Sequence, residues 1–292
     1  MANILNVVLP TFIVILIGFL LGKKKKMDMS AVVDVAMYIG LPALAFTSML
    51  EKEIILQDAI KVWASALIIM LGCGIISWVI FRILKQKHSG LYIPISIMNT
   101  VNIPFPIIYL AFGSAGIFAA TLFYIPNALL IYSVGVYIMS KKHWKESIKE
   151  VFKVPLLYAA VLGLVLNLLR INVPQLITEP LDFIGLMGIP LVLIVLGYNL
   201  SNVRLTSLPT TFLSSFLRMG VGFLLGIFTV NIFNLTGLLR SIVILDSAMP
   251  AAVLSSILAT KYRNEANLVS SVVFVTTVIS LVTIPLLLMI LS

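Results

Sequence analysis

The sequence predicts an all-α integral membrane protein with ten transmembrane helices, arranged as two inverted five-helix repeats in which helices 4 and 9 are broken. Three observations predict this class: the composition, the length of the apolar runs, and the equal number of such runs on each side of one polar linker. Of 292 residues, 61% are hydrophobic and 11% are charged, whereas soluble domains are about 45–50% apolar and about 25% charged. The mean hydropathy is +1.14.

Ten apolar segments follow one another along the chain, each near the length of about 20 residues that crosses a bilayer. The first is expected to be a retained helix, because the charges of Lys23 to Lys26 follow the apolar run and a cleaved signal peptide has them before it. The expected spans are residues 3–22, 32–50, 59–84, 91–112, 115–139, 154–169, 176–200, 208–233, 238–260 and 268–291.

The loops between these spans differ in charge. Alternating the loops between the two sides puts 15 Lys and Arg residues on one side and four on the other, and leaves Arg218 inside a span. Cytoplasmic loops are enriched in such residues, so the first side is expected to be cytoplasmic, with both termini external and the protein in the cytoplasmic membrane of the cell. The net charge of +9 is then a topology signal, and no nucleic-acid partner is expected.

The sequence offers little chemistry for catalysis or metal binding. Cys73 is the single cysteine, and His88 and His143 stand in basic loops, so no group of residues has metal-ligand spacing. No HExxH motif, aspartate-rich motif or Ser/His pair occurs in the spans. We expect no cofactor, no metal and no enzymatic activity. An intramembrane enzyme, or a multipass signalling or scaffold protein without transport, is the alternative.

The longest polar stretch, residues 140–153, divides the spans into two sets of five. It carries Trp144, Ile148 and Phe152 at helical spacing among lysines, which fits an interfacial amphipathic helix or a plain juxtamembrane linker. The expected domains are a first repeat of residues 1–139, this cytoplasmic linker, and a second repeat of residues 154–292. Because five is odd, the second repeat must be inverted, as in many secondary transporters.

Two short motifs indicate the same repeat. Residues 39–42 (IGLP) in the second span match residues 187–190 (MGIP) in the seventh, and the fourth span of each half is interrupted by proline. Pro104 and Pro106 in one half and Pro250 in the other predict broken helices, because proline lacks an N–H donor and clashes with the preceding turn. Broken backbone in a membrane must be satisfied by protein or water.

Paired breaks in corresponding positions indicate a substrate site near the membrane midplane. Two ordinary proline kinks would be the structural alternative. Polar residues beside the breaks favour a site, because such side chains are costly in lipid unless they have a function. They are Asn99, Thr100, Asn102 and Asp246.

At these residues the sequence resembles the auxin efflux carrier family, which includes plant auxin exporters and bacterial permeases for malonate, malate and similar acids. The resemblance covers nearly the whole chain in order and spacing. It is carried by Asn99-Thr100 with Pro106 and Gly113, by residues 248–252 (AMPAA) with Ala259 and Lys261-Tyr262, by residues 41–46 (LPALAF), and by Ile189-Pro190-Leu191 with Leu196-Gly197.

The resemblance implies a scaffold of helices 1, 2, 6 and 7 and a moving transport domain of helices 3–5 and 8–10. Helices 4 and 9 would cross at the centre, where half-helix N-termini meet a substrate carboxylate. Independently of the resemblance, backbone N–H groups at a helix start make an anion site. The scaffold would be the natural face for a homodimer. The chain has no long central cytoplasmic loop, which favours a compact prokaryotic-type permease.

The sequence departs from the family pattern around both breaks. Met98, Val101 and Pro104 stand where family members often have small residues, and Ser255 stands where plant members have a further proline. Pocket shape, and therefore the substrate, cannot be carried over. Substrate-binding candidates are Asn99, Thr100, Asn102, Pro104, Pro106, Asp246, Pro250 and Ser255.

Two charged residues within spans have alternative readings. Asp246 is either an ion-coupling carboxylate, carrying H⁺ or binding a cation, or a structural group that caps a half-helix or pairs with Arg218. Arg218 either forms that charge pair or neutralises a second substrate charge. The predicted function is a secondary transporter of small organic anions that works by alternating access. Substrate identity, direction and the coupling ion, H⁺ or Na⁺, stay open.

Overall fold

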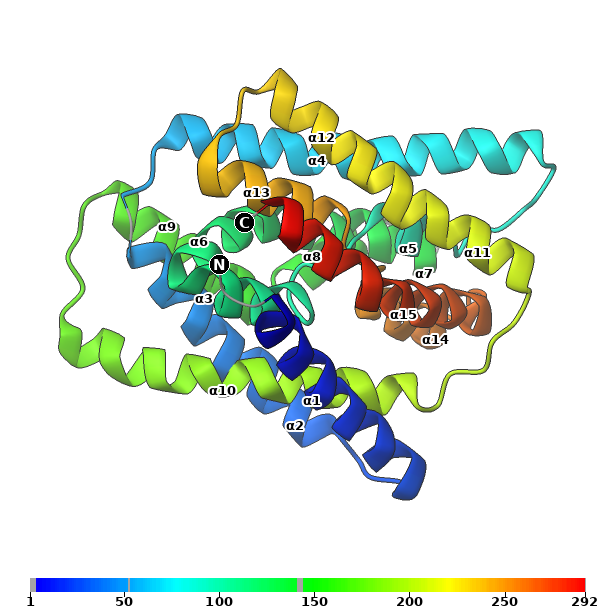
Figure 1. Cartoon of the computed structure of the whole chain (residues 1–292), viewed down its shortest axis with the longest axis horizontal. Helices are drawn as coiled ribbons and strands as arrows, with labels where there is room; N and C mark the ends of the chain where they lie inside the picture. Colours follow the sequence, from blue (N-terminus) through cyan, green and yellow to red (C-terminus); the bar gives the residue numbers. More distant parts are fainter. Residues whose placement is uncertain (1–3, 52, 141–143, 292) are drawn as a thin grey trace. The chain divides into compact units, whose positions relative to one another are not determined.

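The computed structural model describes residues 4–51, 53–140 and 144–291 (Figure 1). Within these ranges the chain is helical and forms no β-strand beyond one isolated bridge. The helices are α1 (Ile4–Lys24), α2 (Ser30–Val35), η1 (Ala36–Gly40), α3 (Leu41–Leu50), α4 (Leu56–Ile83), α5 (Tyr92–Ser96), α6 (Pro104–Leu130), η2 (Ile131–Gly135), α7 (Val136–Ser140), α8 (Trp144–Val151), α9 (Pro155–Leu168), α10 (Gln175–Leu200), α11 (Leu208–Phe216), η3 (Leu217–Val221), α12 (Gly222–Ile232), α13 (Gly237–Ser247), α14 (Val253–Lys261) and α15 (Ala266–Leu291).

Seven helical runs in the described chain are long and apolar enough to cross a membrane, so the protein is an integral membrane protein. Their surfaces carry large exposed apolar side chains, as lipid-facing helices do. Three of the ten expected spans are absent from this set. The sixth is a helix of only 14 residues, α9, and the fourth and ninth are divided by non-helical backbone. The seven are Asn6–Lys24, Ser30–Leu50, Leu56–Ile83, Pro104–Ser140, Gln175–Leu200, Leu208–Ile232 and Ala266–Leu291.

Gly113 separates the fourth span from the fifth inside α6. Its φ of 64° and ψ of −158° are not helical, and glycine tolerates a positive φ because it has no Cβ. The kink falls between the expected ends of these spans at residues 112 and 115. The helical run therefore continues through η2 and α7 to Ser140 with a change of direction at Gly113.

The polar linker contains a helix, α8, which spans Trp144–Val151 of the expected 140–153 segment. Phe152 directly after it is exposed, and Ser147 is buried. Residues 141–143 lie outside the described chain. The expected external position of both chain ends also involves residues 1–3 and 292, which are not described.

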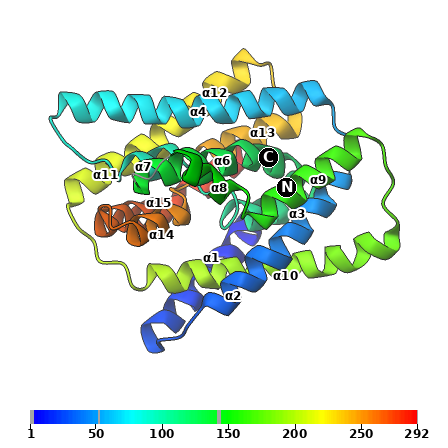
Figure 2. The ribbon, with the colours of Figure 1, turned by 180° about the vertical axis from the view of Figure 1, so that it is seen from behind.

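The chain forms two compact units that do not follow the order of the sequence. Unit 1 comprises residues 1–61, 101–125 and 154–202. In it α1 packs along α10, and α3 packs on both α9 and α10, so that α10 runs past α1 and α2 (Figure 2). The helices approach closely where Gly40 meets Gly188, because a Cβ on Gly40 would lie 2.7 Å from the Cα of Gly188.

Unit 2 comprises residues 62–100, 126–153 and 203–292. In this unit α12 packs on α13, α14 on α15, and α11 on α15 (Figure 1). Each unit combines segments from both expected repeats. Residues 101–125, which the resemblance groups with the moving helices 3–5, belong to unit 1.

Candidate functional site

Both predicted breaks are present in the structure. Residues 97–103 are non-helical between α5 and α6, and residues 248–252 are non-helical between α13 and α14. Pro250 lies within its break. Pro104 and Pro106 instead lie in the first turn of α6, just after the unwound segment. The reason is that proline fits a first helical turn, where its missing N–H is not needed, but cannot continue a helix from the preceding residues.

The two unwound segments pair with each other inside unit 2. The amide N–H of Asn99 donates to the carbonyl of Pro250 at 2.8 Å, and the N–H of Ala252 donates to the carbonyl of Ile97 at 3.1 Å. These bonds form an antiparallel bridge centred on Met98 and Ala251. Backbone groups released by breaking two helices therefore satisfy one another, which an apolar environment requires.

The side chain of Asn127 in α6 stabilises the first break by hydrogen bonds. Its Nδ2 donates to the carbonyl of Met98 at 3.0 Å and to Oγ1 of Thr100 at 2.6 Å. Asn127 is 4% exposed and Thr100 is 3% exposed. Sequence reasoning did not select Asn127. Its signal was an asparagine within the otherwise apolar span of residues 115–139, next to Pro126.

Thr276 of α15 fastens the second break in a similar way. Its Oγ1 accepts the N–H of Ala251 at 3.2 Å and donates to the carbonyl of Val272 at 2.7 Å. Sequence reasoning also missed this residue. A threonine in an apolar helix gives no signal, because most such hydroxyls bond only to their own helix, as that of Thr277 does with Val273.

Arg218 joins the two half-helices that lead into the breaks. It is fully buried, and its Nη1 donates to the carbonyls of Ile95 at 2.9 Å and Ser96 at 3.0 Å, while Nη2 donates to the carbonyl of Ser247 at 2.7 Å. These carbonyls belong to the last turns of α5 and α13, where the helix dipole is negative. The guanidinium thus caps two helix C-termini at once.

Asp246 is fully buried one residue before that cap. Neither of its carboxylate oxygens has a hydrogen-bond partner in the described chain, and no ion pair joins it to Arg218, whose bonds go to carbonyls. The charge pair and the half-helix cap considered from the sequence are therefore not formed here. Ion coupling through Asp246 stays a prediction.

The remaining candidates divide between the two units. Asn99, Thr100, Pro250 and Ser255 are buried in unit 2, and the Ser255 hydroxyl has no partner among the described residues. In unit 1, Asn102 is half-buried while Pro104 and Pro106 are buried.

The start of α6 has few N–H groups to offer an anion. Pro104 and Pro106 have none, and those of Phe105 and Ile107 donate to the carbonyls of Val101 at 3.1 Å and Ile103 at 3.5 Å. The N-terminal turn that the resemblance assigns to substrate binding is therefore largely self-satisfied at this break.

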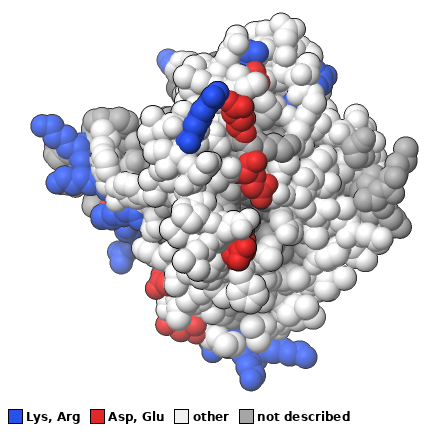
Figure 3. Space-filling view, turned by 90° about the vertical axis from the view of Figure 1, so that its left-hand side faces the viewer, with Lys and Arg blue, Asp and Glu red and all other residues white. Residues whose placement is uncertain are grey.

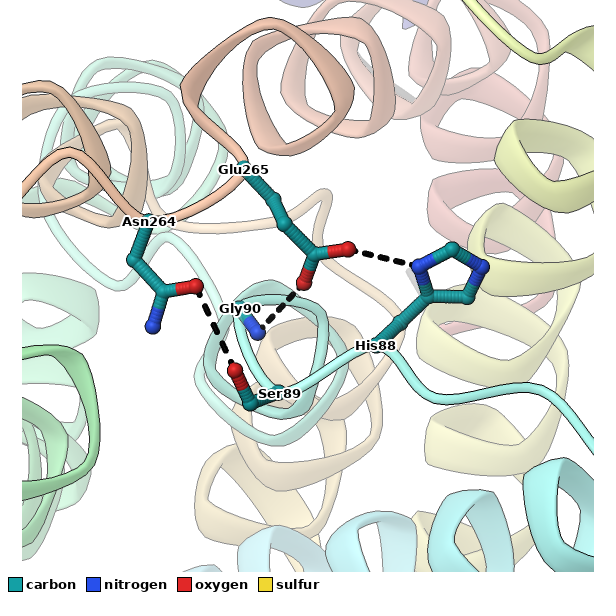
Figure 4. A network of polar contacts seen from close by, with 5 residues as sticks. All are labelled: His88, Ser89, Gly90, Asn264 and Glu265. Carbon is teal, nitrogen blue, oxygen red and sulfur yellow. Dashed lines mark hydrogen bonds and ion pairs between the residues drawn. The ribbon is translucent and has the colours of Figure 1, made fainter.

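A polar network ties the loop before α5 to the loop between α14 and α15 (Figure 4). His88 Nδ1 lies 2.6 Å from Glu265 Oε1, and the N–H of Gly90 donates to Glu265 Oε2 at 2.7 Å. The hydroxyl of Ser89 donates to Asn264 Oδ1 at 3.3 Å. The α5 and α14 half-helices are thus linked through their flanking loops as well as at their breaks.

Unit 1 has a surface cavity of about 480 Å³, lined among others by Glu51, Glu53, Arg170 and Asp182. The Arg170 Nη2 to Glu53 Oε1 distance is 2.7 Å, and both side chains are largely exposed. Figure 3 shows acidic side chains in a row on one face of the molecule, with a basic side chain beside one of them. A cavity rich in carboxylates does not fit an anionic substrate.

Comparison with known proteins agrees with the geometry. A family model described as membrane transport protein matches residues 3–288. An uncharacterized transporter of Methanocaldococcus jannaschii is 25% identical over 97% of each chain. An uncharacterized transporter of Methanothermobacter thermautotrophicus is 28% identical over 96% of this chain and 95% of its own.

Proposed function

The chain belongs to the membrane transport protein family, the auxin efflux carrier family that its sequence resembles, and from this premise we propose that it is a secondary transporter of small organic anions such as carboxylates. It would work by alternating access at the paired helix breaks. The relatives it matches are named as transporters, which disfavours an intramembrane enzyme or a signalling or scaffold protein.

The observation that carries this proposal is the bridge between Met98 and Ala251. It joins two interrupted half-helices that lie far apart in the sequence, and it brings buried Asn99 and Thr100 together with the break that contains Pro250. Discontinuous helices at a repeat interface are where secondary transporters bind their substrates. Asn99, Thr100, Asp246, Pro250 and Ser255, which all belong to unit 2, would form the substrate site.

Packing in unit 1 supports the inverted repeat of ten helices. If the two repeats are equivalent, helix 1 corresponds to helix 6 and helix 2 to helix 7. A contact of helix 1 (α1) with helix 7 (α10) should then have a counterpart between helix 6 (α9) and helix 2 (α3). Both contacts are made. The matched motifs also meet, because Gly40 lies directly against Gly188. A two-fold pseudo-axis brings equivalent residues together in this way.

The division into units supports a moving domain and a fixed one. Unit 1 holds the expected scaffold helices 1, 2, 6 and 7 in α1, α2 to α3, α9 and α10. Unit 2 holds most of helix 3 and all of helices 8, 9 and 10. Unit 2 would form most of the part that carries the substrate, and helices 1, 2, 6 and 7 of unit 1 would provide the fixed scaffold and the homodimer face.

Asp246 would couple transport to protons. An ionised carboxylate with no partner is costly to bury, and its place in the last turn of α13 puts it at the negative end of the helix dipole. Binding a proton removes this cost. The basic loops would face the cytoplasm of the cell, with both termini external.

Counterflow in proteoliposomes tests the proposal. Vesicles are loaded with one unlabelled acid from a panel of malonate, malate and an aromatic acid, and uptake of its labelled form is followed. Counterflow requires alternating access but no driving gradient, so exchange of any acid supports the transporter proposal. The absence of exchange across the panel, with folded protein, would contradict an organic-anion substrate.

Asp246→Asn separates coupling from transport in the same vesicles. We expect exchange to persist while accumulation driven by a pH gradient is lost. Asp34→Asn removes an exposed acid from α2 and should keep both activities. If Asp246→Asn still accumulates substrate in response to the pH gradient, Asp246 is not the coupling group.

A further inference from the structure

Arg218 is among the largest side chains that are fully buried in the described chain. A buried guanidinium is costly unless its charge is compensated. No carboxylate compensates it here, because Asp246 is not among its partners. Three main-chain carbonyls do so instead, two from the last turn of α5 and one from the last turn of α13.

The position of those carbonyls gives the cap its significance. They are the C-terminal ends of the two half-helices that enter the breaks, and such ends carry a partial negative charge. In transporters with discontinuous helices, half-helix C-termini and unwound carbonyls are the groups that coordinate a coupling Na⁺. In this protein a covalently attached cation already occupies that position.

The residues around Arg218 leave room for its guanidinium. Arg218 lies in the π-helical turn Leu217–Val221, a widened turn that often occurs at functional positions. One turn later, Gly222 leaves the space for the guanidinium, since a Cβ there would collide with Arg218 Nη2 and with the carbonyl of Ser247. Gly226 similarly leaves space for the side chain of Ser247.

We propose that the Arg218 guanidinium is a fixed cation at the C-terminal ends of the half-helices α5 and α13. It takes the place of a sodium ion that could dissociate, so this transporter works without sodium. The inference rests on the proposed transport function and deepens it. Arg218 is a positioning residue: it holds the C-termini of α5 and α13 together through every cycle. With no ion to release at these carbonyls, energy coupling is left to a group other than this site.

The first test uses purified wild-type protein and has two readouts, thermal unfolding, which does not depend on transport, and exchange, which does. Its thermal unfolding temperature is compared in NaCl, KCl and choline chloride at equal ionic strength, and labelled-acid exchange is compared in the same salts. We expect no difference between the salts in either measurement. Stabilisation by Na⁺ specifically, or exchange that needs Na⁺, would overturn the proposal. No exchange in any salt, with the unfolding temperature unaffected, would count against the transport function alone.

The second test opens the site with Arg218→Ala. We expect exchange to fall about tenfold or more, because three charge-assisted hydrogen bonds are lost, and millimolar guanidinium to restore it and raise the unfolding temperature. Arg240→Met removes an arginine that bonds to exposed Asn231 in the same unit and should show neither effect. An Arg218→Ala variant with normal stability and normal exchange would overturn the proposal.

Substrate binding by Arg218 would give a different pattern. In that case Arg218→Ala would raise the KM for dicarboxylates without changing kcat and would leave exchange of monocarboxylates as in the wild type, and this result would also overturn the proposal. If Arg218→Ala does not fold, even with guanidinium present, the salt comparison on the wild-type protein still decides the question.

Discussion

The amide of Asn99 donates a hydrogen bond of 2.8 Å to the carbonyl of Pro250. One residue comes from the first interrupted span and the other from the second, so this bond and its neighbour between Ala252 and Ile97 connect the two halves of the sequence within unit 2. A small number of side chains around this bridge hold it in place, and each can be tested separately.

Replacing Asn127 should loosen the first break. In Asn127→Leu the carbonyl of Met98 and the hydroxyl of Thr100 lose their donor, and buried polar groups without partners cost about 1–3 kcal/mol. We expect a lower thermal unfolding temperature and slower exchange. Asn231→Leu replaces an exposed asparagine of the same unit and serves as the control. Equal unfolding temperatures for wild type and Asn127→Leu would show that the side chain does not support the break.

Thr276 and Thr277 provide a matched pair at the second break. Thr276→Val keeps the shape of the side chain but removes the acceptor for the N–H of Ala251, so we expect a loss of about 1 kcal/mol in stability and reduced exchange. Thr276→Ser should retain both. Thr277→Val removes a hydroxyl that bonds only within its own helix and should have a smaller effect. If the two valine variants behave alike, the bond to Ala251 has no special role.

A methyl group at residue 222 should displace the guanidinium cap. Gly222→Ala places a Cβ against Arg218 Nη2 and the carbonyl of Ser247, and overpacking of this kind costs about 1–3 kcal/mol. For Gly220→Ala, the three atoms nearest to the new Cβ all belong to the ring of Phe216, an exposed side chain that can move. We expect loss of exchange and of stability for the first variant and near-normal behaviour for the second, measured by counterflow and thermal unfolding. The reverse order would contradict the assigned geometry.

Gly188 should be essential for packing in unit 1. Its substitution by alanine puts a Cβ 2.8 Å from the backbone N of Leu41 and 2.9 Å from the carbonyl carbon of Gly40, so α10 must move away from the junction of η1 and α3. Alanine raises helix propensity by about 1 kcal/mol over glycine, yet we expect net destabilisation of about 1–3 kcal/mol. Leu186→Ala on the same helix truncates a partly exposed side chain and should be milder. A more stable Gly188→Ala protein would mean that the helices are not in close contact there.

The sequence indicated the membrane class, the breaks and the family because each depends on local or compositional signals. Long apolar runs indicate lipid-facing helices, whichever other helices they pack against. Pro104 and Pro250 indicate interrupted helices, because proline has no N–H to donate to the helical hydrogen bond, whatever surrounds it. The family model over residues 3–288 confirms the resemblance that these residues carried.

Other features depended on distant partners. The sequence suggested Asp246 as one partner for Arg218, because opposite charges in a membrane are expected to pair, but the guanidinium instead bonds to main-chain carbonyls, which every residue has and which leave no sequence signal. Asn127 and Thr276 were missed for the same reason. Their importance comes from the backbone groups of Met98 and Ala251 that they meet.

By itself, then, the sequence determined that the chain spans a membrane in many helices, where two of them break, and which polar residues lie at the breaks, because these properties follow from hydropathy and from the covalent limits of proline. Only the tertiary structure decided that the breaks pair with each other and that Arg218 joins two helix ends. Backbone carbonyls and amides are nearly the same at every position. Which of them pair is therefore set by packing between distant segments, and no local pattern of side chains predicts that pairing.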